Sequence, residues 1–167
     1  ESLRNLCFQP QRRFYHEELG WNFRMTNMQA ALGVAQLERL DEFVSKKRHT
    51  GQKYTELLSD IDSIQLPLQK TDYAQNIYWV YGVFLKENSG LTAIDAMKKL
   101  ADKKIGTRPF FLGMHQQPVF KKMGLFKDES YPVAENLAKM GFYLPSGLAV
   151  TDDQICRSAE ALRSILK

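Results

Sequence analysis

The sequence is poor in cysteine, with only Cys7 and Cys156 among its 167 residues. Neither has a second cysteine nearby, which excludes a CxxC redox pair and a dense disulfide framework and fits a reducing cytoplasm. Long apolar runs are also absent. The longest, residues 77–85, is far shorter than the roughly 20 residues that cross a membrane, and no signal-peptide pattern follows Glu1. We therefore expect a cytoplasmic protein with no membrane span.

Motifs of a self-sufficient active site are missing as well. The sequence contains no GxSxG elbow, no phosphate-binding GxxxxGK, no dinucleotide fingerprint and no HExxH. Its three histidines, His16, His49 and His115, are far apart and lack the spacing of metal ligands. We predict neither a catalytic residue nor a metal site within this chain.

Positive charge is in mild excess, with 23 lysines and arginines against 19 aspartates and glutamates. Much of the excess comes from lysine pairs at positions 46–47, 98–99, 103–104 and 121–122. Such pairs on amphipathic helices usually form a solvated face, whereas nucleic-acid binding needs a concentrated basic stripe. We expect no nucleic-acid partner.

Helices are predicted from capping signals and apolar periodicity. Thr26 with Gln29 has capping-box spacing and opens a helix that the pattern extends to about Leu58, with a break near Gly51. A second helix follows Thr92. A short one spans residues 132–140, and the last begins at Thr151.

Four extended segments are predicted between these helices, at residues 64–67, 77–85, 105–111 and 142–145. Pro109 places the third at an edge or a strand end. In a continuous strand, Tyr78 and Val80 would face one side and Trp79 and Tyr81 the other. The predicted fold is α/β, with a long helix and a small, mostly antiparallel sheet that helices cover on one side.

The first residues predict an interrupted helix. Leu3 and Leu6 have helical spacing, but Pro10 leaves only one turn, which is not stable alone. We expect the chain to begin inside an element of something longer.

Two segments carry polar side chains suited to a ligand. Asn22 and Arg24 occupy alternate positions before a helix N-terminus, where a phosphate would fit. Alternatively, Asn22 turns the loop and Arg24 forms a surface ion pair. Arg108, Phe110 and His115 can grip a sugar or a phosphorylated ligand, unless they form an ordinary strand end. Trp79 either packs in the core or lines a ligand cavity.

Taken in order, several segments resemble the C-terminal part of the DegT-type sugar aminotransferases. Residues 16–33 read HEELGWNFRMTNMQAALG and continue as AQLE at 35–38. Further matches are GTRPFF at 106–111, HQQP at 115–118, AE at 134–135 and YLPS at 143–146. The resemblance covers essentially the whole chain, and within the family it is most similar to perosamine-synthase-like members.

The resemblance implies a homodimeric fold-type I enzyme that uses pyridoxal phosphate, takes an amino group from glutamate and gives it to a nucleotide-linked keto-deoxy sugar at carbon 4. It implies that Asn22 reaches across the dimer to the cofactor phosphate, with Arg24 near that site. By the same match, Arg108, Phe110 and His115 border the sugar-nucleotide pocket, where we also place Trp79.

One family feature is missing. The family's Schiff-base lysine lies in a serine-led segment just before a Gly-Glu-Gly-Gly stretch, and this chain has no adjacent glycines. We therefore expect residues 1–25 to be a loop region that follows a missing cofactor domain and residues 26–167 to be the C-terminal small domain, inactive and self-associating by itself. The alternatives are a non-catalytic sugar-nucleotide-binding or dimerisation module and a nucleic-acid-binding regulator.

Overall fold

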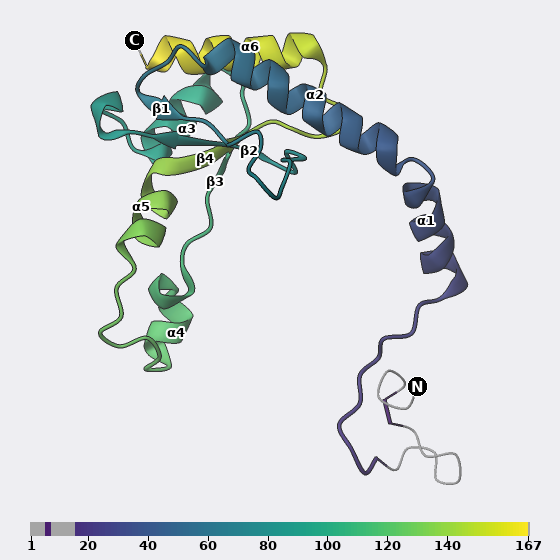
Figure 1. Cartoon of the computed structure of the whole chain (residues 1–167). Coiled ribbons are helices and arrows are strands. Elements are labelled where there is room, and N and C mark those ends of the chain that lie inside the picture. The colour runs from purple at the N-terminus through teal and green to yellow at the C-terminus, as the bar shows by residue number, and fades with distance from the viewer. Residues whose placement is uncertain (1–5, 8–15, 167) are drawn as a thin grey trace. The chain divides into compact units, whose positions relative to one another are not determined.

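The computed structural model describes residues 6–7 and 16–166, and the chain forms two compact units, residues 1–41 and 42–167 (Figure 1). The predicted helical turn around Leu3 lies outside the described residues. Within the part of the chain that is described, no helix is long and apolar enough to cross a membrane.

The first unit contains helix α1, Asn27–Leu37, which begins as the sequence predicts. The Thr26 hydroxyl accepts a hydrogen bond from the Gln29 backbone N–H, and the Gln29 side chain accepts one from the Thr26 N–H. This capping box satisfies donors that a helix N-terminus otherwise leaves unpaired. No residue of α1 is buried.

The predicted break in the long helix is misplaced. The interruption falls at Glu38 and Arg39, and α2 then runs without a break through Gly51 over Leu40–Leu58. Gly51 serves a different purpose, because the ring of Tyr78 packs directly against it. A Cβ on Gly51 would lie 2.2 Å from Tyr78 Cγ, so this glycine permits a close approach and does not end the helix.

The second unit is built on a four-stranded sheet in the order β1-β2-β4-β3. Its strands are β1, Ile64–Gln65; β2, Tyr81–Leu85; β3, Arg108–Pro109; and β4, Gly141–Leu144, and every pairing is antiparallel. The predicted antiparallel sheet is confirmed, and so is the edge position of Pro109. A proline fits there because it has no N–H to give to a further strand.

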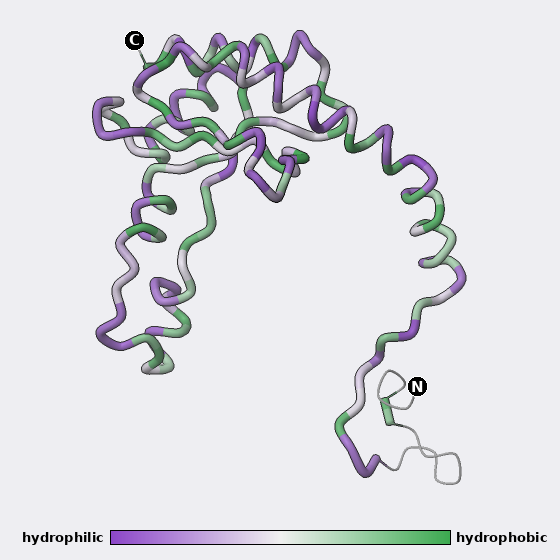
Figure 2. Tube along the Cα trace, in the orientation of Figure 1, coloured by the Kyte–Doolittle hydropathy of each residue, from purple (hydrophilic) through white to green (hydrophobic). Residues whose placement is uncertain are grey.

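One face of the sheet forms the core. Tyr81, Val83 and Leu85 of β2 alternate inward beside Phe142 and Leu144 of β4. They pack against α2, α3 (Ala93–Asp102) and α6 (Asp152–Ile165). Hydrophilic and hydrophobic residues alternate along α2 and α6, as in amphipathic helices (Figure 2). This arrangement confirms the predicted small sheet with helices over one face.

The predicted strand at residues 77–85 is too long, because β2 begins only at Tyr81. Tyr78 has a φ of 50°, in the left-handed region that interrupts a strand. The predicted alternation is therefore wrong. Tyr78 and Tyr81 are both buried with their ring centroids 6.0 Å apart, and Trp79 is 71% exposed.

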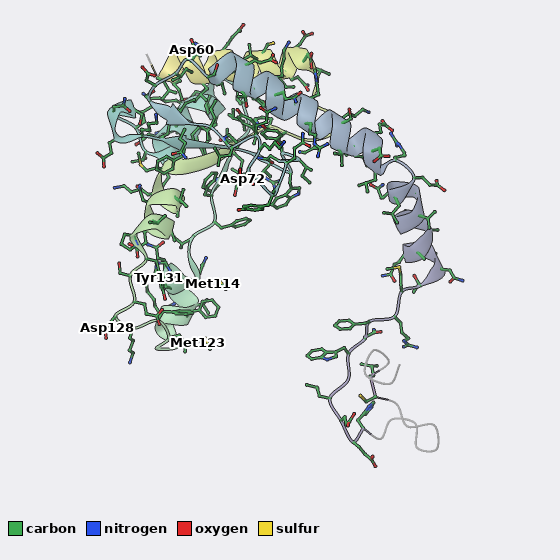
Figure 3. All side chains as sticks on the ribbon, in the orientation of Figure 1. Asp60, Asp72, Met114, Met123, Asp128 and Tyr131 are labelled. Carbon is green, nitrogen blue, oxygen red and sulfur yellow. The ribbon has the colours of Figure 1, made fainter. Side chains whose placement is uncertain are left out.

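The remaining helices form a lobe after β3, which we call the 114–140 lobe. It comprises the 3-10 turn η2 (Met114–Gln116), α4 (Pro118–Lys122) and α5 (Pro132–Met140). The sequence predicted α5 but neither η2 nor α4. Met114, Met123 and Tyr131, labelled on this lobe in Figure 3, are each more than half exposed. A further 3-10 turn, η1, spans Glu87–Ser89.

Candidate functional site

The segment before α1 presents Asn22 and Arg24 to solvent. Both are exposed, and neither side chain has a hydrogen-bond or ion-pair partner among residues 6–7 and 16–166. The alternate residues Trp21 and Phe23 have near-parallel rings with centroids 6.0 Å apart. The polar pair thus keeps an amide donor and a guanidinium available for a ligand.

An anion suits these donors. The Thr26 hydroxyl is already used by the Gln29 N–H in the capping box, so binding at this end of α1 depends on other groups. Asn22 offers two N–H donors and Arg24 a planar fork of five, and charge-assisted hydrogen bonds of this kind match phosphate oxygens.

The sheet face opposite the core carries the second group of predicted residues. Arg108 lies opposite Tyr143 on β4, and Tyr143 lies opposite Gly82 on β2. Residues paired in this way share one face of a sheet. Arg108 is exposed, and its guanidinium has no recorded hydrogen-bond or ion-pair partner within the described ranges.

Phe110 occupies a slot on this face that two glycines create. A Cβ on Gly141 would lie 2.2 Å from Phe110 Cδ2, and a Cβ on Gly82 would lie 2.9 Å from its Cζ. The Phe110 ring centroid is 4.6 Å from that of Tyr143, and the Phe110 N–H donates to the Gly141 carbonyl at 3.1 Å. These contacts fix the strand that carries Arg108.

Trp79 lies just before β2, at a kink held by Lys47 of α2. The Lys47 Nζ donates to the Trp79 carbonyl at 2.7 Å and to the Ser146 carbonyl after β4. Burial lowers the pKa of this lysine. Deeper in the core, burial raises the pKa of Tyr81 to about 12, and its hydroxyl lies 2.9 Å from Thr55 Oγ1. The half-buried Lys47 thus braces the loop, while the Trp79 side chain stays 71% exposed.

His115 is buried in the 114–140 lobe. Its Nε2 donates to Glu135 Oε1 at 3.0 Å, and its ring meets that of Tyr131 edge-on at 4.9 Å. The same carboxylate oxygen accepts from the Tyr131 N–H at 2.9 Å. The Tyr131 N–H and then the His115 imidazole lower the pKa of Glu135.

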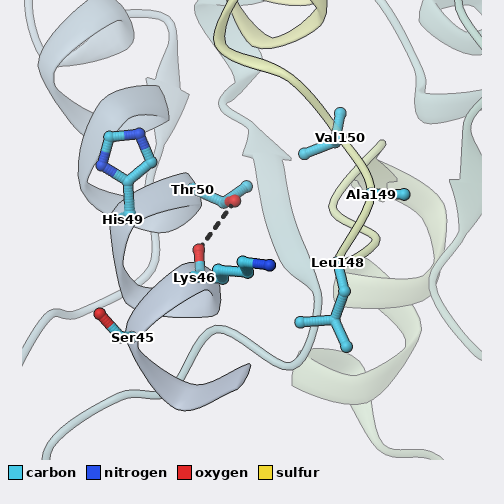
Figure 4. Close-up of a pocket in the computed structure, with 7 residues that line it drawn as sticks. All are labelled: Ser45, Lys46, His49, Thr50, Leu148, Ala149 and Val150. Atoms are coloured by element: carbon cyan, nitrogen blue, oxygen red, sulfur yellow. Dashed lines mark hydrogen bonds between the residues drawn. The ribbon is translucent and has the colours of Figure 1, made fainter. Parts of the chain in front are cut away.

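A groove of about 500 Å³ lies elsewhere, between α2 and the loop before α6 (Figure 4). Its lining residues are Ser45, Lys46, His49, Thr50, Leu148, Ala149 and Val150. The side chains of His49 and Lys46 are already paired, since His49 Nε2 lies 2.8 Å from Asp152 Oδ1 and Lys46 Nζ lies 2.7 Å from Glu42 Oε1. No residue predicted to bind a ligand lines this groove.

The structure brings some predicted residues together and separates others. Arg108 and Phe110 share the sheet face opposite the core, and Trp79 precedes β2 of the same sheet. His115 belongs to the 114–140 lobe, while Asn22 and Arg24 lie in the first unit. Among the described residues, no cluster of histidine, cysteine, aspartate or glutamate could hold a metal ion.

Sequence reasoning missed three residues that position this surface, namely Lys47, Glu135 and Tyr143. Lys47 looked like one member of a solvated lysine pair, because its partners are 32 and 99 residues away. Glu135 and Tyr143 stood out only as parts of family matches. For Tyr143, strand alternation with buried Phe142 and Leu144 would have indicated the opposite face.

Comparisons with known proteins agree with this fold. Residues 1–163 match the DegT/DnrJ/EryC1/StrS aminotransferase family, and the chain belongs to it. GDP-perosamine synthase of Escherichia coli O157:H7 is 31% identical over 151 residues, which are 90% of this chain and 39% of that protein. The synthase of Caulobacter vibrioides is 30% identical over 164 residues, 98% of this chain and 43% of that protein.

The fold is similar to that of solved aminotransferases. The aminotransferase TlmJ from Streptoalloteichus hindustanus superposes with a TM-score of 0.83 at 22% identity, over 99% of this chain and 43% of that one. The chain thus spans about two fifths of the proteins it matches. Family membership implies pyridoxal phosphate as the cofactor.

Proposed function

We propose that this chain is the C-terminal part of a pyridoxal-phosphate-dependent aminotransferase that transfers an amino group from glutamate to carbon 4 of a nucleotide-linked keto-deoxy sugar. A preceding domain supplies the Schiff-base lysine, so residues 1–167 by themselves are inactive. Two GDP-perosamine synthases that match nearly the whole chain support this choice of substrate class.

The observation that carries the proposal is the position of Arg108. Arg108 is exposed on the sheet face opposite the core. The nearby Phe110 is held in position by its close packing against Gly82 and Gly141. A planar fork of donors binds phosphate oxygens in pairs, and aromatic walls complete a sugar-nucleotide site. In this arrangement Arg108 binds the diphosphate and Phe110 fixes its strand.

His115 takes part through the 114–140 lobe. Its imidazole is buried and bonded to Glu135, so it shapes the lobe that borders the sugar and does not point a free donor at solvent. Trp79 provides an exposed aromatic surface at the start of β2.

Asn22 and Arg24 fit the phosphate of the cofactor, because both are exposed donors and the neighbouring Thr26 is already used as a cap. We place them at the phosphate of a partner subunit's cofactor in a homodimer. When bound, pyridoxal phosphate supplies an electron-withdrawing ring that makes proton removal at the amine-bearing carbon accessible. The two side chains hold and orient the phosphate and take no part in proton transfer.

Lys47 does not provide the reactive amine. Its Nζ donates to two backbone carbonyls, so it acts as a structural cation. A lysine that forms a Schiff base must have a free amine directed at the carbonyl carbon.

The other candidates are a non-catalytic module that binds a sugar nucleotide or dimerises and, less favoured, a nucleic-acid-binding regulator. The described lysines of the second unit are spread over α2, α3, α4, α5 and the segments between them, and Lys46 is paired with Glu42. Nucleic-acid binding requires a concentrated basic surface, which this distribution does not favour.

Thermal denaturation of the product of the complete reading frame tests the proposal. We expect GDP-mannose, a stable sugar nucleotide, to raise the Tm, because a ligand that binds only the folded state stabilises it. Arg108→Met should abolish most of that shift. The regulatory alternative would be supported by salt-dependent binding of duplex DNA without any response to the sugar nucleotide.

A further inference from the structure

Three contacts lock Tyr78 in its left-handed conformation. Its N–H donates to Asn76 Oδ1 at 2.7 Å. Its ring packs where a side chain on Gly51 would collide with it, and the next carbonyl, that of Trp79, accepts from Lys47 Nζ. A non-glycine residue persists at φ 50° only where its surroundings enforce it, and such positions gather at ligand sites.

This kink buries Tyr78 and turns Trp79 outward. Tyr78 is 2% exposed, whereas the next residue, Trp79, is 71% exposed. A large aromatic side chain on a locked backbone is a preorganised contact surface, because little backbone freedom is lost when a ligand binds.

The side chains of Asn76 and Lys47 beside Trp79 are already hydrogen-bonded. Asn76 accepts from the Tyr78 N–H and donates its own amide to the Leu68 carbonyl at 2.9 Å. Lys47 bonds two carbonyls. Trp79 therefore presents an exposed indole face beside side chains whose hydrogen bonds are already made, and such a face suits stacking on a planar heteroaromatic base.

Trp79 and Arg108 lie at the same end of the sheet. β2 starts at Tyr81 opposite Leu144, the last residue of β4, and Arg108 opens β3 opposite Tyr143. Because β4 separates β2 from β3, those two strands are about 10 Å apart. A nucleoside diphosphate is long enough to span the spacing between β3, which carries Arg108, and β2, which Trp79 precedes.

We propose that Trp79 stacks on the base of the nucleotide whose diphosphate binds Arg108, and that Lys47 and Gly51 act as positioning residues for the indole. The inference rests on the proposed function and adds the group that recognises the nucleotide base.

Calorimetric titration of the complete protein tests the inference, with GDP, UDP, dTDP and inorganic pyrophosphate as probes. For the tightest nucleoside diphosphate, Trp79→Ala should raise the Kd about tenfold or more, the usual effect of losing one stacked base. Trp79→Phe should raise it less, and pyrophosphate affinity should not change. Arg108→Met should weaken both kinds of ligand.

Substitutions of Lys47 test its role in positioning the indole. Lys47→Met should weaken nucleoside diphosphate binding while leaving pyrophosphate binding unchanged, and Lys47→Arg should restore much of the loss because arginine can also donate to two carbonyls. Tyr73→Ala is the matched control, since Tyr73 is 91% exposed on the same loop and should have no effect.

The outcomes separate the two proposals. If the wild type binds nucleoside diphosphates and Trp79→Ala binds them equally well, or loses pyrophosphate in the same proportion, the stacking inference is overturned and the proposed function stands. If the wild type binds no nucleoside diphosphate, both proposals fall.

Discussion

The imidazole Nε2 of His115 lies 3.0 Å from Oε1 of Glu135 and links the turn η2 to helix α5 across 20 residues of sequence. The ionised carboxylate can only accept, so the imidazole donates. Glu135 also accepts from the Tyr131 N–H just before α5. One carboxylate of α5 thus holds both η2 and the residue before the helix, and it anchors the 114–140 lobe.

Replacing His115 by alanine should therefore lower the Tm by a few degrees, because the substitution leaves a cavity and removes a donor from Glu135. Thermal denaturation followed by circular dichroism measures this change. His49→Ala is the control, since His49 and Asp152 are 59% and 54% exposed and surface pairs contribute little. Equal effects of the two substitutions would contradict the anchoring role.

The same contact predicts a dependence on pH. Hydrogen bonds from Tyr131 and then His115 hold the pKa of Glu135 below its usual value in the folded state. Stability from this carboxylate is therefore present above its unfolded pKa, about 4.3, and lost as pH falls through the lower folded value. The Tm difference between wild type and Glu135→Gln should shrink as pH falls through this range, and a constant difference would oppose the assignment.

Gly51→Ala should destabilise the second unit by about 1–3 kcal/mol, because the added methyl group overpacks the contact with Tyr78. Gly33→Ala makes the matched comparison, since a Cβ there meets no atom within 4 Å. In a helix that change should stabilise by about 0.5–1 kcal/mol. Urea unfolding measures the change in the free energy of unfolding for both variants. The prediction fails if Gly51→Ala leaves that free energy unchanged.

Arg163 joins α6 to the end of α2. Its guanidinium binds Asp60 through two nitrogens and donates through Nε to the Leu57 carbonyl at 2.9 Å. The hydrogen bond from Arg163 is the main cause of the lowered pKa of Asp60, so the pair stabilises the fold above the unfolded pKa, about 3.9, and weakens as pH falls through the folded value. Arg163→Met should lower the free energy of unfolding more at pH 7 than at pH 3, as urea unfolding at the two pH values would show. A larger loss at pH 3 would contradict the prediction.

Exposed apolar side chains on α1 predict self-association of residues 1–167. Met28 is 81% exposed and Leu32 is 70% exposed, one helical turn apart. Exposed patches of this kind drive association. Light scattering should show a mass that rises with concentration, and Met28→Glu with Leu32→Glu should suppress the rise. A wild type that remains a monodisperse monomer would contradict this prediction.

Local signals in the sequence were enough to predict the helix starts. Thr26, Thr92 and Thr151 each cap a helix, and all three form a capping box in the structure. The antiparallel pairing of the strands and the edge position of Pro109 were also predicted from the local sequence. Such features depend on neighbours three or four residues away, or on a single missing N–H.

Long-range contacts were not predictable in this way. The kink at Tyr78 depends on Gly51 and Lys47, which lie in helix α2, and the apolar run at residues 77–85 gave no sign of it. The packing of the Phe110 ring requires two glycines, Gly82 and Gly141, on different strands. For the candidate site, the resemblance pointed to Arg108 and His115, but only the structure shows that one is exposed and the other buried.

Amination measured by mass spectrometry tests the central claim most directly. The product of the complete reading frame that encodes residues 1–167 would be incubated with pyridoxal phosphate, glutamate and a GDP-linked 4-keto-6-deoxy sugar. We expect a GDP-linked 4-amino sugar, with 2-oxoglutarate formed in equal amount, and no product from residues 1–167 alone. Recovery of the unchanged keto sugar from the complete protein, across GDP-, UDP- and dTDP-linked substrates, would contradict it.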